Sequence, residues 1–258
     1  MLELHQVEVA YNKTETAVRG VSLKIEPGKT TALLGTNGAG KTTTLTAISG
    51  FLGMENAQVV GGQITFDGKR IDKMAPHRIS RLGISLVPER SKVFDTLTVA
   101  DNVKLTARSK KRAEGIYEEF PRLGELAGRT AGYLSGGEKQ LLALAMALMT
   151  EPDVLLVDEL SLGLAPRVTA DLLSELQRVQ VDRGLTVLLV EQNAAAALQI
   201  ADYAYVMEDG RVVHDGTPEA LMSHGDIVEF YLGTSQSGDT HRSYRDVKQY
   251  RRKRRWAG

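Results

Sequence analysis

The 258-residue sequence contains no cysteine, which excludes disulfide bonds and thiolate metal sites and is compatible with a reducing compartment. It also lacks a long apolar run. The longest nearly unbroken one, LLALAMALM at 141–149, has about half of the roughly 20 residues that a membrane-spanning helix needs. The start of the chain lacks a basic leader followed by an apolar segment, so no secretory signal is expected. We expect the protein to stay where it is made and to act at a membrane only through a partner.

The sequence has no net charge, because 32 basic residues balance 32 acidic ones. The charges are nevertheless segregated: residues 236–258 carry eight Lys or Arg and two Asp, a net charge of +6, which leaves the rest of the chain at −6. A neutral or acidic body lacks the basic face that a nucleic-acid backbone requires. Nucleic acid is therefore not an expected partner. Apolar residues make up 42% of the chain, which is enough for a well-buried core.

The pattern of apolar residues predicts an α/β fold. Alternation over 7–11 and 21–25 predicts half-buried strands, and Asp67-Gly68 between apolar pairs predicts a tight hairpin over 64–71. Short apolar strands then alternate with helical stretches, which is typical of a mostly parallel sheet wrapped by helices. The strands are expected at 30–35, 153–159, 185–190 and 203–213, and the helical stretches at about 167–183 and 193–201.

Residues 35–42, GTNGAGKT, fit the pattern G-x-x-x-x-G-K-[ST] directly after an expected strand. In this pattern glycines let backbone N–H groups converge on phosphate oxygens, and the start of the following helix adds its positive end. We expect Lys41 to reach the β and γ phosphates, Thr42 to hold Mg²⁺, and Thr43 to bind the α phosphate. A merely flexible loop is the alternative. The remaining candidate nucleotide-binding residues of the loop are Gly35, Asn37, Gly38, Ala39 and Gly40.

Two acids end the apolar run DVLLVDE, at the strand end where ligands of such sheets bind. Asp158 would hold the metal ion, mostly through water, and Glu159 would polarise the attacking water. One carboxylate beside an ordered water suffices, because hydrolysis of a γ phosphate depends mainly on positioning and charge neutralisation. Acids at a strand end can instead cap the next helix, but the phosphate loop in the same sheet favours the catalytic interpretation.

A second anion-binding helix start is predicted at residues 134–140, LSGGEKQ. Ser135 and Glu138 fit a capping box, which accounts for these two residues by helix capping alone. Capping does not account for Gly136 and Gly137, since each glycine costs about 1 kcal/mol in a helix interior. We therefore expect another group to approach the backbone closely at this point.

The motifs GTNGAGKT, LSGGEKQ and LLVDE, in this order and spacing, resemble those of ABC transporter ATP-binding subunits. The resemblance implies a P-loop NTPase (RecA-like) core with an antiparallel β subdomain and an inserted helical subdomain. It places the core at 1–90 and 151–233, the helical subdomain at 91–150, and a basic, flexible tail at 234–258. It also implies that Ser135, Gly136, Gly137 and Glu138 contact ATP held by the opposite subunit, so that each chain carries two half-sites and ATP binding closes a dimer.

Finer features resemble the LivF type, one of the two ATPases of branched-chain amino-acid uptake systems. They are LGISLVPER, EFPRL, SLGLAP, LLVEQN and the terminal FYLG. This resemblance implies two membrane permease subunits, a second ATPase that is identical or related, and indirectly a periplasmic or extracellular solute-binding protein. The chain would lie at the cytoplasmic face of the cell membrane as a peripheral subunit, with ATP and Mg²⁺ as its ligands.

Three further site residues follow from the resemblance. Tyr11 occupies the position that stacks on adenine, although a strand residue in the core is the alternative. Gln192 replaces a common histidine and would donate to the γ phosphate without a proton that titrates near neutral pH, or else it is a polar residue at a helix start. Glu89 replaces a common glutamine and would lie near metal and nucleotide, where it is a third candidate for the metal site beside Thr42 and Asp158. Leu160 and Met146 stand where many relatives carry proline and arginine.

Two other functions are compatible with the phosphate loop alone. A soluble ABC ATPase of cluster assembly or DNA repair is disfavoured, because only 94 positions separate Lys41 from Ser135, too few for a long coiled-coil insertion. A P-loop kinase or GTPase is also disfavoured, because the LSGGEKQ motif would have no function in either class of protein. The tail is consistent either with a solvated disordered segment or with binding of Arg251–Arg255 and Trp256 to an anionic membrane surface.

Overall fold

The computed structural model describes residues 1–90 and 92–224, which form two sheets and the helices around them. The α/β class predicted from the sequence is confirmed. The terminal FYLG motif, the end of the predicted core and the whole basic tail lie outside the described residues.

The first sheet is antiparallel and has the order β2-β1-β4-β5. Asp67 and Gly68 connect the last two of its strands with φ angles of 48° and 74°, so the predicted tight hairpin is confirmed. Alternate residues of the first two strands are buried, as predicted. The strands are β1 (Leu2–Tyr11), β2 (Glu15–Ile25), β4 (Ala57–Phe66) and β5 (Lys69–Arg70).

The second sheet has six strands in the order β10-β9-β3-β8-β7-β6, and all neighbours are parallel except β10 and β9. Two of its features go beyond the prediction: β6 was not expected, and β9 and β10 form an antiparallel pair. The strands are β3 (Thr30–Gly35), β6 (Ile84–Val87), β7 (Val154–Asp158), β8 (Thr186–Glu191), β9 (Tyr203–Glu208) and β10 (Arg211–Gly216).

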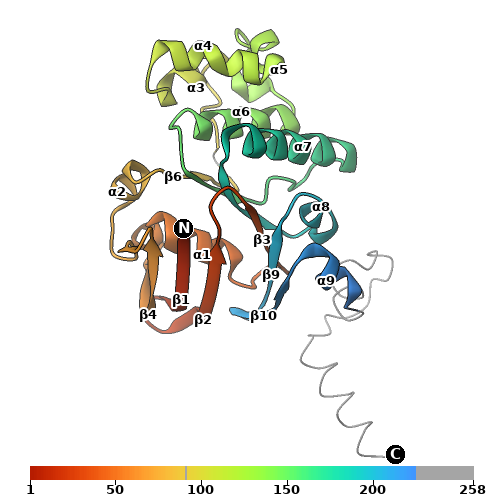
Figure 1. Ribbon diagram of the computed structural model, residues 1–258. Helices are drawn as coiled ribbons and strands as arrows, with labels where there is room; N and C mark the ends of the chain where they lie inside the picture. Colours follow the sequence, from red (N-terminus) through yellow and green to blue (C-terminus); the bar gives the residue numbers. More distant parts are fainter. Residues whose placement is uncertain (91, 225–258) are drawn as a thin grey trace, which may run out of the picture.

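Helices lie on both faces of the parallel sheet, with α1 on the side of the antiparallel sheet and α6 and α7 on the other, and α3, α4 and α5 lie beyond α6 (Figure 1). They are α1 (Lys41–Ser49), α2 (Pro76–Arg81), α3 (Val99–Thr106), α4 (Lys110–Glu119), α5 (Pro121–Glu125), α6 (Gly136–Leu148), α7 (Pro166–Arg183), α8 (Ala194–Leu198) and α9 (Pro218–Ser223), with 3₁₀ turns at Leu52–Glu55 and Ala131–Tyr133. Within residues 1–90 and 92–224, no helix combines the length and the apolar character needed to cross a bilayer.

The parallel sheet separates two apolar cores, which explains why β7 is apolar at every position before Asp158. On β7, Leu155 and Val157 belong to the core on the α6 and α7 side, whereas Val154 and Leu156 belong to the core shared with α1 and the antiparallel sheet. All four side chains are at most 2% exposed. The sheet is therefore held from both faces, and its carboxyl ends are fixed in space.

Ion pairs centred on Glu119 join the end of α4 to α7. The Glu119 carboxylate is paired with Arg183 and lies 3.9 Å from Arg112, while Arg178 donates to the Glu119 carbonyl oxygen at 2.6 Å. The side chains of Glu119 and Arg183 are only 16% and 20% exposed. These contacts attach the outer helices to the layer that packs on the sheet.

Glu119→Ala is expected to lower the free energy of unfolding by about 1–3 kcal/mol, because it leaves partly buried guanidinium groups without their partner. Urea denaturation followed by circular dichroism measures the change. Glu118→Ala, at the exposed neighbouring position, is the matched control and should change it by less than about 0.5 kcal/mol. Equal stability of the two variants would contradict the assignment.

Candidate functional site

The predicted phosphate loop connects the end of β3 to the start of α1, and its glycines are required by close backbone contacts. Gly40 precedes α1 with a φ of 95°, and a Cβ there would lie 2.8 Å from the carbonyl oxygen of Ala17. A Cβ on Gly35 would lie 2.4 Å from the carbonyl oxygen of Met207. Because neither position has room for a side chain, the loop can follow this path only with glycine.

The Lys41 side chain is buried within the loop, with 4% of its surface exposed. Its Nζ donates to the carbonyl oxygens of Gly35 and Thr36 at 2.9 and 3.1 Å, and it lies 3.6 Å from Oε1 of Glu159. The ammonium group is therefore already surrounded by oxygen acceptors, as it would be beside phosphate oxygens.

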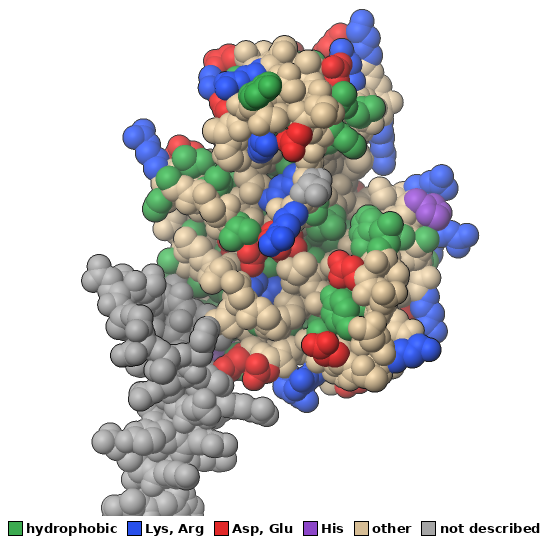
Figure 2. All heavy atoms as spheres, turned by 180° about the vertical axis from the view of Figure 1, so that it is seen from behind, with side chains coloured by type: hydrophobic (Ala, Val, Ile, Leu, Met, Phe, Trp, Pro, Cys, Tyr) green, Lys and Arg blue, Asp and Glu red, His purple; other side chains and the backbone are tan. Residues whose placement is uncertain are grey.

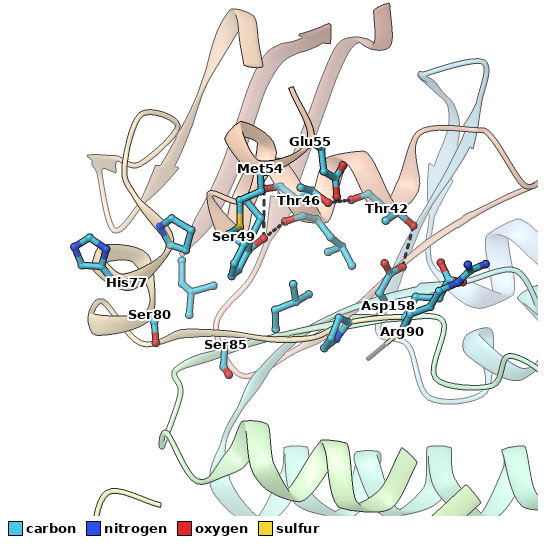
Figure 3. A pocket seen from close by; sticks show the side chains of 17 residues that line it. Thr42, Thr46, Ser49, Met54, Glu55, His77, Ser80, Ser85, Arg90 and Asp158 are labelled. Atoms are coloured by element: carbon cyan, nitrogen blue, oxygen red, sulfur yellow. Dashed lines mark hydrogen bonds and ion pairs between the residues drawn. The ribbon is translucent and has the colours of Figure 1, made fainter. Parts of the chain in front are cut away.

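Asp158 and Thr42 face each other between the end of β7 and the start of α1 (Figure 3). Thr42 Oγ1 donates to Oδ1 of Asp158 at 3.2 Å. Burial raises the pKa of Asp158 to about 6; the charges of Glu159 and Glu89 add to this effect, whereas the Thr42 hydrogen bond and the charge of Lys41 oppose it. The charge of Lys41 and the Thr42 hydrogen bond therefore do not fully compensate for the burial of the Asp158 carboxylate.

This oxygen pair fits Mg²⁺, which prefers oxygen ligands and usually retains water and phosphate in its coordination shell. The described part of the chain contains no cluster of three His, Cys, Asp or Glu residues that could hold a metal ion by itself. An ion at Thr42 and Asp158 would therefore depend on phosphate oxygens and water for its other ligands.

Glu159 directly follows β7 in a strained backbone conformation. Its φ is 45°, in the left-handed region, which non-glycine residues adopt at a cost of about 1 kcal/mol or more. Its N–H donates to the carbonyl oxygen of Val190 on β8 at 2.9 Å, and only 8% of the residue is exposed. The neighbouring strand thus holds Glu159 in a conformation that turns its carboxylate toward Lys41.

A cavity of about 690 Å³ surrounds the phosphate loop. Tyr11 lines it from the end of β1: its hydroxyl lies 3.2 Å from Thr43 Oγ1 and donates to Glu55 at 3.0 Å. Tyr11 is only partly buried, unlike the core residues of β1. The cavity is lined by Tyr11, Asn12, Glu15, Ala17, Asn37, Gly38, Gly40, Lys41, Thr42, Thr43, Glu89, Arg90, Glu159 and Leu162.

Lys and Arg side chains lie next to Asp and Glu side chains in a depression near the middle of the face that Figure 2 shows. Among the residues that line the cavity, Glu89 contributes a carboxylate just after β6, and Arg90 Nε donates to it at 3.0 Å. Glu89 therefore lies beside the predicted nucleotide site, and its role as a metal ligand stays a prediction.

The predicted capping box at the start of α6 is confirmed. Glu138 N–H donates to Ser135 Oγ at 3.3 Å, and Ser135 N–H donates to Glu138 at 2.9 Å. The hydrogen bond from the Ser135 backbone, followed by those from Arg122 and the Ser135 hydroxyl, lowers the pKa of Glu138 against the effect of burial. Arg122 also binds the Glu138 carboxylate at 2.8 Å. Both capping partners are thus engaged within the chain.

The two glycines of this helix start have a packing reason within the chain that the sequence did not indicate. A Cβ on Gly137 would lie 2.5 Å from Cγ1 of Val168, and one on Gly136 would lie 3.0 Å from Cδ2 of Leu164. None of Ser135, Gly136, Gly137 and Glu138 lines the cavity around the phosphate loop. A single chain therefore does not bring its two anion-binding helix starts into one cavity.

Gln192 is exposed directly after β8. The helix-start role that was its alternative belongs to its neighbour, because Asn193 caps α8 by accepting from the N–H of Ala196 at 3.1 Å. Leu160 and Met146 are 0% and 7% exposed in the core next to α6 and α7. Apolar side chains thus fit both positions at which the sequence departs from the common family pattern.

Two charged residues beside the site were not predicted from the sequence. Lys92 Nζ donates to Oε1 of Gln140 on α6 at 2.6 Å; burial lowers the pKa of Lys92 to about 8, and the charges of Asp158 and Glu89 oppose this shift. Glu191, at the end of β8, is 1% exposed and binds Ser161. The one available signal was an acid ending an otherwise apolar strand.

Comparison with known proteins assigns a family to this arrangement. The family described as "ABC transporter" matches residues 18–161. The chain is 38% identical over 239 residues to the "High-affinity branched-chain amino acid transport ATP-binding protein BraG" of Pseudomonas aeruginosa, covering 90% of this chain and all of that one. It is 37% identical to the "Probable branched-chain amino acid transport ATP-binding protein LivF" of Archaeoglobus fulgidus, covering 83% and 91% of the two chains.

The fold agrees with a solved structure of the same kind. A nucleotide-free ATP-binding cassette from an ABC transporter superposes with a TM-score of 0.78 at 26% identity, covering 91% of this chain and 99% of that one. The predicted P-loop NTPase core with mixed sheets is thereby confirmed.

Replacement of Asp158 by Asn tests the charge imbalance of the site. Because the pKa of Asp158 is raised from 3.8 to about 6 in the folded chain, the folded state binds more protons between these pH values, and stability falls as the pH rises through this window. Asp158→Asn keeps an acceptor for Thr42 and removes the charge. Without nucleotide at pH 8 it should be about 1–3 kcal/mol more stable than the unsubstituted chain in urea denaturation.

The stability difference should shrink when the same titration is done at pH 5. Asp171→Asn, at an exposed position on α7, is the control and should have no such effect. If Asp158→Asn is no more stable than the unsubstituted chain at pH 8, the carboxylate is compensated by another group and the interpretation is wrong.

Proposed function

Because this chain belongs to the ABC transporter family of ATP-binding proteins, we propose that it hydrolyses ATP to power an importer of branched-chain amino acids or related small polar solutes. The names of the two relatives support the solute class. The observation that carries the activity is the convergence of Lys41, Thr42, Asp158 and Glu159 at the carboxyl edge of one parallel sheet.

In this proposal the loop residues bind the triphosphate. The backbone N–H groups of the glycine-rich loop and the start of α1 bind phosphate oxygens, and Lys41 exchanges its carbonyl partners for the β and γ phosphates. Thr43 binds the α phosphate, and the ring of Tyr11 stacks on adenine at the rim of the cavity. Thr42 and Asp158 hold Mg²⁺, which would neutralise charge on the phosphates.

Glu159 is proposed to orient and polarise the water that attacks the γ phosphorus, since its carboxylate lies beside Lys41 with little exposure to solvent. Gln192, exposed at the end of the adjacent strand, would donate an amide hydrogen bond to the γ phosphate. Lys41 and the start of α1 stabilise the charge that develops on the phosphate oxygens.

Residues 135–138 of the LSGGEKQ motif, here called the signature, are proposed to complete the site of a second ATPase chain. Ser135 and the backbone of Gly136 and Gly137 start α6 at the surface, away from the cavity of their own chain. The positive end of α6 can therefore meet a γ phosphate that another chain presents. ATP binding then closes a dimer, and hydrolysis reopens it. The second chain is either identical or a related ATPase.

We propose that this chain works with two permease subunits, one of which docks on a groove beside Glu89, and this docking would place the chain at the cytoplasmic face of the cell membrane. A solute-binding protein would act indirectly. The groove has a volume of about 700 Å³ and lies between α1, α2 and β6 (Figure 3). Met54 and Phe51 line it and are 80% and 37% exposed. Glu89 and Asp158 line the same groove, so a docked helix would sense the nucleotide site directly.

A soluble ATPase of cluster assembly or DNA repair is not favoured. Among the described residues between Lys41 and Ser135, the longest helix is α4, with ten residues. That length leaves no room for the long coiled coil that such proteins would insert at this point. The division of the chain into a core at 1–90 and 151–233, a helical subdomain at 91–150 and a tail at 234–258 remains part of the proposal.

Glu159→Gln tests the catalytic assignment. The amide keeps the size of the side chain but cannot polarise water as a base, so turnover should fall at least about 100-fold while ATP still binds. Size-exclusion chromatography with ATP and Mg²⁺ should then show a dimer that the unsubstituted chain forms only transiently. Unchanged hydrolysis by Glu159→Gln would remove Glu159 from this role.

Copurification tests the transport assignment. Tagged chain expressed with its neighbouring genes should retain membrane proteins, and Met54→Arg in the groove should release them by introducing an unpaired charge. The matched control is Val181→Arg on α7, an exposed position outside the groove, which should not affect retention. Recovery of soluble scaffold proteins or DNA instead of membrane proteins would favour the alternative function.

A further inference from the structure

Glu191 is a buried carboxylate that the reaction does not use directly. It ends β8 with 1% of its surface exposed. Its Oε1 accepts a hydrogen bond from the backbone N–H of Ser161 at 2.9 Å, and its Oε2 accepts one from the Ser161 hydroxyl at 2.6 Å. Both oxygens therefore bind Ser161, one at its backbone and one at its side chain.

Burying the Glu191 carboxylate costs desolvation free energy, so its presence at this position indicates a role. Burial raises the pKa of Glu191, although the hydrogen bonds from Ser161 oppose the shift. Within residues 1–90 and 92–224, no Lys, Arg or His nitrogen lies within 4 Å of its carboxylate. The preceding residues of β8 are buried and largely apolar, so an apolar residue would fill this position at a lower desolvation cost.

The residue that Glu191 holds belongs to the loop that follows Glu159. Two neighbouring residues of β8 fix this loop: Val190 accepts from the Glu159 N–H at 2.9 Å, and Glu191 accepts from Ser161. The loop then turns on itself, because Leu164 N–H donates to the Ser161 carbonyl oxygen at 3.1 Å. Since Glu159 has a φ of 45°, its position depends on such external restraints.

The loop also leads from the nucleotide site to the start of α6. Leu162 is 47% exposed at the cavity around the phosphate loop. Leu164 packs against Gly136, since a Cβ on Gly136 would lie 3.0 Å from Cδ2 of Leu164. On the other side, Glu191 is followed directly by exposed Gln192. A displacement of Glu191 would thus shift Glu159, Gln192 and the start of α6.

We propose that Glu191 is a positioning residue that clamps Ser161 and thereby holds Glu159 and the loop 161–165 in the geometry needed for hydrolysis. This inference rests on the proposed ATPase function. Glu191 touches neither nucleotide nor water in this account; it acts through Ser161. Its loss therefore affects the rate of turnover far more than the binding of ATP by the phosphate loop.

The test compares steady-state ATP hydrolysis by the full-length chain and four variants, Glu191→Ala, Ser161→Ala, their combination and Glu191→Gln. Glu191→Ala should lower kcat at least about tenfold. KM should change less than about twofold, because the substitution leaves Lys41 and the rest of the phosphate loop unaltered. Ser161→Ala removes one of the two hydrogen bonds and should lower kcat about threefold or more. The double variant should be no slower than Glu191→Ala, because both substitutions break the same clamp.

Glu191→Gln should recover most of the activity, since its amide oxygen can accept from the Ser161 N–H while its amide nitrogen donates to the hydroxyl. Gln180→Ala is the matched control for lost stability. Gln180 is also a buried polar residue with a hydrogen bond, to the carbonyl oxygen of Gly28 at 2.7 Å, but it lies outside the site. Its removal should lower the melting temperature and leave kcat unchanged.

A merely structural role for Glu191 predicts that Glu191→Ala and Gln180→Ala have the same kcat, and this result would overturn the proposal. If Glu191→Ala does not fold, the rate of Ser161→Ala tests the proposal instead. Hydrolysis by Ser161→Ala at the rate of the unsubstituted chain would equally overturn the proposal. Absence of hydrolysis by the unsubstituted chain would instead refute the proposed function, so the two failures are distinguishable.

Discussion

The proposed chemistry depends on several carboxylates that are buried next to one lysine at the carboxyl edge of a parallel sheet. Asp158, Glu159 and Glu191 are each at most 8% exposed, and Lys41 is the one cation paired with any of them in the described part of the chain. Negative charge therefore exceeds positive charge at the end of the sheet. Burial is the main cause of the raised pKa values of Asp158 and Glu191, and the charge of Glu159 adds to it; binding of a cation together with phosphate would relieve the excess negative charge.

The rest of the fold holds these groups in place against their mutual repulsion. Two apolar cores fix the ends of β7 and β8 from both faces of the sheet. Close backbone contacts at Gly35 and Gly40 determine the path of the phosphate loop, and a hydrogen bond to Val190 holds the left-handed conformation of Glu159. The signature at the start of α6 is held by its capping box, but it lies outside the cavity around the phosphate loop of its own chain. This separation supports the proposal that the signature binds the nucleotide of another subunit.

Much of this could be predicted from the sequence because the motifs are local. The phosphate loop, the capping box at Ser135 and the hairpin at Asp67-Gly68 each follow from a few adjacent residues, and all three have the predicted conformation. The missed features join distant segments: β6 at the edge of the sheet, the bond from Lys92 to Gln140, and the clamp of Glu191 on Ser161. No local pattern encodes these contacts, since they arise only when the strands take their order in the sheet. The packing of Gly137 against Val168 was missed for the same reason.

The central claim is that a single chain carries two incomplete halves of a reaction centre. Complementation between Lys41→Ala, which lacks the phosphate-binding lysine, and Ser135→Trp, which blocks the signature, tests it most directly. Each variant alone should be inactive, whereas an equimolar mixture forms one intact composite site in each mixed dimer and should recover about a quarter of the unsubstituted rate. A mixture that stays as inactive as its components, while the unsubstituted chain hydrolyses ATP at the same concentration, would contradict the account.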